Sequence, residues 1–185
     1  MKFYFFGDSI CFGQYISPHL TWVHKISEAF PDILFQNPSI NGDITRGALD
    51  RLHHDVLSHK PDIVYIQFGL NDCNVWESDN GVPRITIHAF EGNITDMVIR
   101  CKAFDIDVIL ATNHPILKNN EMNMLYNNAI RYISNDECML IDHEKIWKDK
   151  DIKTLLLPDG VHLSKEGHKI YYNIMVKELG EKLYE

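Results

Sequence analysis

The sequence predicts an α/β fold in three layers, with helices on both faces of a mostly parallel sheet. Short apolar runs and helical patterns alternate five times along the 185 residues, which is the order expected of βαβ units. The run DIVYIQF (62–68) is apolar almost throughout, as is typical of a strand buried on both faces. Linkers, repeats and low-complexity stretches are absent from the sequence, so we expect one domain over residues 1–185.

Each expected strand is a short apolar run. In chain order they are residues 2–6, 33–36, 62–68, 107–112 and 138–142. The first, KFYFF, stops at Gly7, where small polar residues take over. The sheet is therefore expected to begin almost at Met1.

The expected helices lie between these runs. Trp22, Ile26 and Phe30 recur every four residues, which predicts a helix that ends before Pro31. Further helices are expected at residues 44–57, from about 86 to 104, near 121–133, and from 164 onward. All but the last of these helices would carry the chain from one parallel strand to the next.

Polar residues follow four of the expected strands. They are Gly7-Asp8-Ser9, Asn41-Gly42-Asp43, Gly69-Leu70-Asn71-Asp72 and Thr112-Asn113-His114-Pro115. Ligands of open α/β sheets bind beyond the carboxyl ends of the strands, so the four segments should share one edge of the sheet. This edge is where we expect the functional site.

Composition excludes several classes of function. A net charge of -8 without runs of Lys or Arg argues against nucleic acid or an anionic membrane surface as the main partner. No window of 18 apolar residues occurs, and the amino-terminal apolar run is too short for a signal peptide, so we expect a cytoplasmic protein. The four cysteines stand alone, without a metal-binding or redox spacing, and we expect reduced thiols and no metal or cofactor.

A candidate acyl-transfer site combines residues from both ends of the chain. Asp159 and His162 lie three positions apart before a helix, so the carboxylate can reach Nδ1 while Nε2 faces a nucleophile. Ser9 needs such a base to become reactive. The Gly42 N–H and the Asn71 amide are suitable donors to an oxyanion. Taken locally, Gly-Asp-Ser is more typical of a plain turn, and His162 of a capping or core histidine.

Four sequence blocks resemble the GDSL or SGNH hydrolase family. They are GDSI with Ser9, SINGD with Gly42, GLND with Asn71, and DGVHLS with Asp159 and His162. They come in the order of that family; Ile10 replaces the leucine that is common there. The resemblance implies a flavodoxin-like, five-stranded parallel sheet of order 2-1-3-4-5. It also implies that Ser9 is the nucleophile, His162 the base and Asp159 its orienting acid, with Ser9 N–H, Gly42 and Asn71 as the oxyanion hole.

Three further residues are candidates for substrate binding, each with a structural alternative. The segment 73–88 is long for a connection between a strand and a helix, so it could cover the cleft. Within it, Trp76 either stacks on a sugar or packs in the loop, and Arg84 pairs either with a substrate carboxylate or with Glu77 or Asp79. His114 either contacts substrate or makes a structural hydrogen bond.

We therefore predict a serine-dependent ester hydrolase that removes a short acyl group, such as acetyl, from a carbohydrate or another small polar ester. The alternatives are a thioesterase or lysophospholipase for longer chains, a non-catalytic acyl-binding or scaffold protein, and acyl transfer to an acceptor other than water. The expected partner is the small-molecule ester alone, and the oligomeric state is left open.

Overall fold

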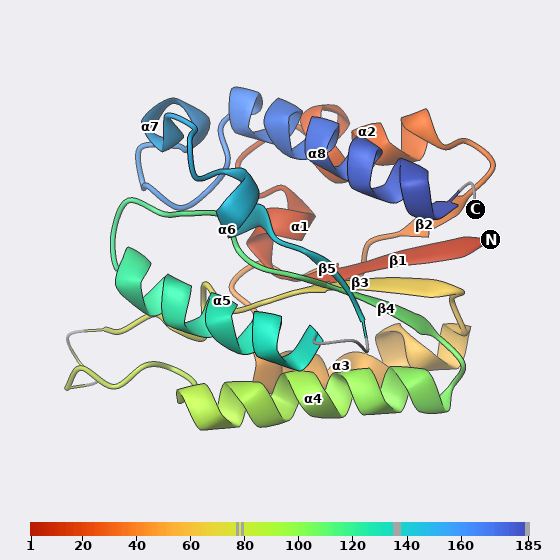
Figure 1. The fold of residues 1–185 in the computed structure, drawn as a ribbon, viewed down its shortest axis with the longest axis horizontal. Coiled ribbons are helices and arrows are strands. Elements are labelled where there is room, and N and C mark those ends of the chain that lie inside the picture. The colour runs from red at the N-terminus through yellow and green to blue at the C-terminus, as the bar shows by residue number, and fades with distance from the viewer. Residues whose placement is uncertain (77, 79, 135–137, 184–185) are drawn as a thin grey trace.

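A parallel five-stranded sheet forms the centre of the molecule (Figure 1), in a computed structural model that describes residues 1–76, 78, 80–134 and 138–183. The strands are β1 (Lys2–Gly7), β2 (Leu34–Gln36), β3 (Ile63–Gln67), β4 (Asp107–Ala111) and β5 (Met139–Ile141). Each neighbouring pair is parallel, in the order β2-β1-β3-β4-β5. The α/β class and the predicted strand order are confirmed.

The longer helices lie in two layers, one on each face of the sheet (Figure 1). One layer holds α2 (Trp22–Ala29) and α8 (Lys165–Leu183), which pack together. The other holds α3 (Thr45–Asp55), α4 (Ile87–Ala103) and α5 (Asn120–Ser134). All five begin and end within a few residues of the expected positions, because each has enough turns for an apolar face to recur visibly.

Very short helices were not predicted. They are α1 (Ser9–Phe12), α6 (His143–Ile146) and α7 (Ile152–Leu155), with the 3₁₀ segments η1 (Pro18–Leu20) and η2 (Leu57–His59). A helix of three or four residues completes about one turn, so no repeat of apolar positions can reveal it. Three of these segments, α1, α6 and α7, lie toward the carboxyl ends of the strands.

The core is divided by the sheet into two parts, and β1 contributes to both. Phe3 and Phe5 face the layer of α2 and α8, whereas Tyr4 and Phe6 face the layer of α3 and α4. Side chains of a strand alternate between faces, so a strand with helices on both sides needs apolar residues at every position. Burying each phenylalanine contributes about 1.5–3 kcal/mol to the free energy of folding.

Among the described residues, no helix has the length and apolarity that a membrane crossing requires.

Candidate active site

The turn from β1 into α1 places Ser9 at the edge of the sheet. Asp8 caps α1, with its Oδ1 accepting a hydrogen bond from Ile10 N at 3.0 Å. A Cβ at Gly7 would come within 2.6 Å of Cys11 Sγ and 2.9 Å of Gln67 O, so only glycine fits between α1 and β3. Ser9 is consequently held as the first residue of a helix, with its side chain at the carboxyl end of the sheet.

A tight loop before α8 carries Asp159 and His162. The Asp159 Oδ1 atom accepts hydrogen bonds from Val161 N at 2.9 Å and His162 N at 3.0 Å. An isolated bridge between Leu156 and Leu163 closes the loop. The Asp159 carboxylate thus folds back on its own loop and is fixed beside the His162 ring.

Ser9, His162 and Asp159 form a continuous chain of hydrogen bonds. The His162 Nδ1 atom lies 2.7 Å from Asp159 Oδ2, and its Nε2 lies 3.0 Å from Ser9 Oγ. Partial burial alone would raise the pKa of Asp159, but the Val161 and His162 N–H groups and the His162 ring hold it below its usual value. An ionised Asp159 keeps the Nδ1 proton on the imidazole, which leaves Nε2 able to accept a proton from Ser9.

Asn71 approaches the same edge from the end of β3. Its Nδ2 donates to Asp8 Oδ2 at 3.1 Å, so one amide hydrogen is engaged and the other is available. Burial raises the pKa of Asp8 to about 7, although the hydrogen bonds from Ile10 N and Asn71 act to lower it. Asp72 is also buried, which raises its pKa to about 6, and it accepts from Thr45 N at 2.9 Å.

Gly42 lies in a turn beside the end of β1. Ile40 N donates to Gly7 O at 3.1 Å, and Asp43 N donates to Ile40 O at 3.3 Å. Gly42 occupies the left-handed region at φ +73°, which favours glycine and turns the chain at this point. The block that contains Gly42 is therefore next to the turn that carries Ser9.

A cavity of about 290 Å³ opens at this edge. It is lined by Ser9, Leu70, Asn71, Cys73, Asn74, Ile116, Lys118, Asn119, Asp159, Val161 and His162. Somewhat larger hollows, of about 340 and 420 Å³, lie elsewhere and contain none of the five predicted catalytic residues. The cavity thus joins three of the four sequence blocks, and its walls combine amides and an ammonium with the apolar side chains of Leu70, Ile116 and Val161.

Comparison with known proteins identifies the family. Residues 5–170 match the model of the GDSL-like lipase/acylhydrolase family. The chain belongs to this family. An acetylxylan esterase from Geobacillus stearothermophilus is 26% identical to this GDSL-like hydrolase over 97% of the chain and 94% of the relative.

Solved structures agree with this assignment. A lipase/acylhydrolase from Enterococcus faecalis is 25% identical, with a TM-score of 0.83 over 98% of this chain and 96% of that one. The structure of an acetylxylan esterase from Geobacillus stearothermophilus, 23% identical, shares the fold with a TM-score of 0.80 over 97% and 94% of the two chains. The GDSL-like chain is accordingly a carboxylic ester hydrolase.

The loop of this GDSL-like hydrolase between β3 and α4 is closed at its base and faces Gly42. Arg84 N donates to Asn74 O at 3.1 Å, and Arg84 Nη1 donates to Gly42 O at 3.2 Å. The guanidinium also lies 5.5 Å from the ring of Trp76, which is exposed. The expected alternative partners of Arg84, Glu77 and Asp79, lie outside the described residues. Arg84 thus contacts the turn of a proposed oxyanion donor.

His114 is buried and makes a structural hydrogen bond, as one of its two predicted alternatives expects. The side chain is 0% exposed, and its Nε2 donates to Val161 O at 2.8 Å. This burial and this hydrogen bond favour the structural alternative, and a direct substrate contact at His114 stays an untested prediction. The sequence placed it correctly after β4 but could not show that it turns inward.

Tyr15 contacts His162 of the candidate site, although the sequence did not single it out. Its ring lies edge-on to the His162 imidazole at 5.0 Å between centroids, and 68% of the residue is exposed. It has a left-handed backbone at φ +67°, a strained conformation for a non-glycine residue that often marks functional sites. A tyrosine outside any periodic pattern carries no sequence signal for such a position.

The described part of the chain contains no group of three His, Cys, Asp or Glu side chains that could hold a metal ion. Whether activity is independent of metal ions stays a prediction.

Proposed function

We propose that this GDSL-like hydrolase uses Ser9 as a nucleophile to remove a short acyl group, such as acetyl, from an oxygen of a carbohydrate or another small polar ester. The observation that carries the proposal is the chain of hydrogen bonds from Ser9 through His162 to Asp159 at the cavity of about 290 Å³.

In the first step, Ser9 Oγ attacks the ester carbonyl while His162 Nε2 takes the hydroxyl proton. The distance of 3.0 Å between these atoms allows direct transfer. Asp159 stabilises the imidazolium that forms. The tetrahedral intermediate then collapses, and His162 returns the proton to the departing sugar oxygen. A water molecule repeats the sequence on the acyl-serine, giving the free acid and restoring Ser9.

The negative oxygen of the intermediate needs donors that are already oriented. In our proposal these are Ser9 N–H, Gly42 N–H and the Asn71 amide hydrogen that is not used by Asp8. Asp8 holds the Asn71 amide and caps the helix of Ser9, so one buried carboxyl aligns both groups.

Two features favour a short acyl group on a polar molecule. The cavity is small, and Asn71, Asn74, Lys118 and Asn119 supply polar groups to its walls. The exposed Tyr15 ring beside His162 offers an aromatic face on which a sugar could stack. The similarity to an acetylxylan esterase supports the same substrate class.

The test is a screen of acetylated xylooligosaccharides with release of acetate measured, beside p-nitrophenyl esters from acetyl to lauroyl. We expect activity on the acetylated sugars, a preference for p-nitrophenyl acetate over the long esters, and no activity in Ser9→Ala. Tyr15→Ala should raise KM for the acetylated sugar about tenfold and leave p-nitrophenyl acetate almost unchanged, whereas Tyr15→Phe should resemble the wild type.

The remaining alternatives predict other results. Preference for lauroyl esters would indicate a lysophospholipase or thioesterase, and acyl products without free acid would indicate transfer. Failure of a fluorophosphonate to label Ser9 would favour a non-catalytic acyl-binding or scaffold protein. Loss of activity with EDTA, restored by a divalent ion, would contradict the proposal of a metal-free reaction. The cytoplasmic location also stays a prediction, which fractionation of the native cells would check.

A further inference from the structure

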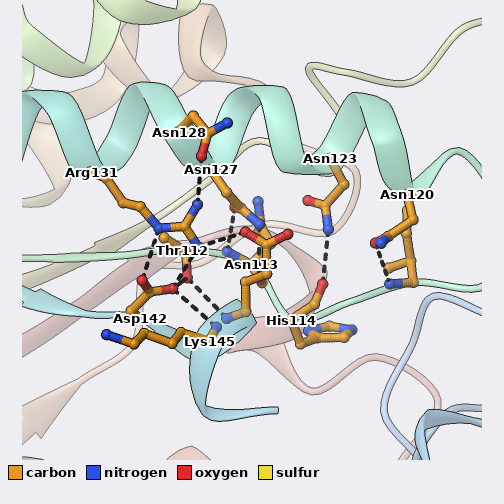
Figure 2. Close-up of polar contacts among 12 residues, drawn as sticks. Thr112, Asn113, His114, Asn120, Asn123, Asn127, Asn128, Arg131, Asp142 and Lys145 are labelled. Atoms are coloured by element: carbon orange, nitrogen blue, oxygen red, sulfur yellow. Dashed lines mark hydrogen bonds and ion pairs between the residues drawn. The ribbon is translucent and has the colours of Figure 1, made fainter. Parts of the chain in front are cut away.

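Three asparagines on one face of α5 hold the segment that follows β4 (Figure 2): Asn120, Asn123 and Asn127. Asn127 exchanges two hydrogen bonds with the backbone of Asn113, at 2.8 and 3.1 Å. Asn123 Nδ2 donates to His114 O at 2.9 Å, and both side chains are fully buried. Asn120 Oδ1 accepts from Ile116 N at 3.0 Å. The spacing of three and four residues places the three amides in a row along the helix.

The segment fixed in this way contacts the loop of Asp159 and His162 at two points. His114 Nε2 donates to Val161 O at 2.8 Å, and Leu117 N donates to Gly160 O at 2.9 Å. Both acceptors lie between Asp159 and His162 in the chain. The α5 asparagines are thereby connected to the site through one short segment.

The bond from His114 leads directly into the catalytic hydrogen bonds. Val161 O belongs to the peptide whose N–H is that of His162, and this N–H donates to Asp159 Oδ1 at 3.0 Å. Asp159 Oδ2 accepts from His162 Nδ1 at 2.7 Å. A hydrogen bond to a peptide carbonyl polarises that peptide and strengthens the bond made by its N–H. These hydrogen bonds connect His114, through the peptide between Val161 and His162, to Asp159 and the His162 ring.

The environment of His114 suits a permanent donor. Burial lowers the pKa of His114 to about 4, so the ring is neutral in the neutral range. A carbonyl oxygen cannot donate, so the proton must be on Nε2. The ring packs against Trp147 at 5.3 Å between centroids, which leaves it no room to rotate freely.

We propose that His114 is a positioning residue: held by the α5 asparagines, its Nε2–H fixes the Val161 carbonyl and so keeps Asp159 and the His162 ring aligned on Ser9. The inference rests on the proposed roles of these three residues. It assigns His114 a function that is neither substrate binding nor proton transfer.

The test compares full-length His114→Phe, which fills the space without a donor, with His114→Gln, whose Nε2 can donate from a similar position. We expect kcat on p-nitrophenyl acetate to fall about 10- to 100-fold in His114→Phe with KM within about twofold, because small misalignments of catalytic groups have effects of this size. His114→Gln should recover to within about fivefold of the wild type.

His143→Phe is the matched control. His143 is equally buried, stacks on Tyr171 at 4.0 Å, and bonds to Tyr65 rather than to the catalytic loop. It should lose stability with kcat retained in the folded fraction. If His114→Phe does not fold, Asn123→Ser is the alternative, because the shorter serine side chain no longer reaches the His114 carbonyl oxygen. This variant should lower kcat about 3- to 10-fold with unchanged KM.

Proton NMR supplies a readout that does not depend on turnover. The low-field signal of the His162 Nδ1 proton bound to Asp159 should weaken or move in His114→Phe and persist in His114→Gln and His143→Phe. An unchanged signal with kcat within threefold of the wild type, or equal impairment of the Gln and Phe variants, would overturn the inference. If Ser9→Ala retains wild-type activity, the proposed function fails, while the NMR comparison still decides whether His114 orients His162.

Discussion

Asn71 and Asp8 show how a single buried carboxyl can arrange two groups of the candidate active site. Asp8 accepts from Ile10 N through one oxygen and from Asn71 Nδ2 through the other, at 3.0 and 3.1 Å. The first contact fixes the helix of Ser9 and the second fixes the orientation of the amide. Because Asp8 is 1% exposed, both bonds are shielded from competing water. The remaining Asn71 hydrogen is thus oriented before substrate binds.

At this scale we predict that Asn71→Ala lowers kcat about 10²- to 10³-fold, with KM changed only slightly. A donor to an oxyanion strengthens as charge develops and contributes little to binding of the uncharged ester. Kinetics and melting temperature should be measured on the same preparation, with Asn74→Ala as a control from the same cavity. A variant with a lower melting temperature but a normal kcat would show that Asn71 only stabilises the turn after β3.

At the scale of elements, the connection between β3 and α4 is joined to the turn after β2. Arg84 N pairs with Asn74 O, Ile85 N donates to Asp72 O at 3.1 Å, and Arg84 Nη1 reaches Gly42 O at 3.2 Å. The connection therefore supports the turn that contains a proposed oxyanion donor. Its conformation should influence kcat as well as substrate access.

We predict that Arg84→Ala lowers kcat roughly 3- to 10-fold, less than the loss of Asn71, because the Gly42 N–H would be loosened rather than removed. Arg84→Lys, which can still donate to Gly42 O, should retain most of the rate. Arg100→Ala, which removes an ion pair with Asp96 on the surface of α4, is the control. A change confined to KM would instead assign Arg84 to substrate binding, the alternative that the sequence suggested.

At the scale of the whole molecule, buried titratable groups link stability to pH. Burial lowers the pKa of His114 and His168 to about 4 and of His143 to about 3. The unfolded chain binds protons on these histidines below about pH 6.5, whereas the folded chain does not, so they destabilise the fold on acidification. Burial has the opposite effect on two carboxyls: Asp8 and Asp72 stay protonated in the fold up to a pKa of about 7 and about 6.

Between about pH 4 and 6 the unfolded state therefore binds about one proton more than the folded state. It gains three protons on the histidines, whereas the folded state keeps two on the carboxyls. We predict that the free energy of unfolding falls by about 1.4 kcal/mol for each pH unit of acidification in this range, measured by urea titration. Asp72→Asn removes one opposing carboxyl and should steepen the slope to about 2.7 kcal/mol per unit. A slope that is flat, or unchanged in the variant, would contradict this assignment of charges.

The sequence by itself determined the fold class, the five strands and the candidate residues at the edge of the sheet. Apolar runs and helical repeats report which faces of an element are buried, and that information is sufficient for a parallel sheet covered on both sides. The blocks around Ser9, Gly42, Asn71 and His162 also stood out, because residue types suited to acyl transfer follow strand ends.

Only the tertiary structure gave the distances between the side chains that the resemblance brought together, and the contacts that no sequence block contains. His162 Nε2 and Ser9 Oγ are 153 positions apart in the chain and 3.0 Å apart in space. His114 faces inward to Val161 O, and the Tyr15 ring lies edge-on to His162, although neither contact leaves a pattern in the sequence. The physical reason is that sequence periodicity reports which face of a helix or strand is buried. A contact between two loops depends instead on where the loops come together in space. When the acceptor is a backbone carbonyl, any residue type can supply it, so the sequence carries no sign of the bond.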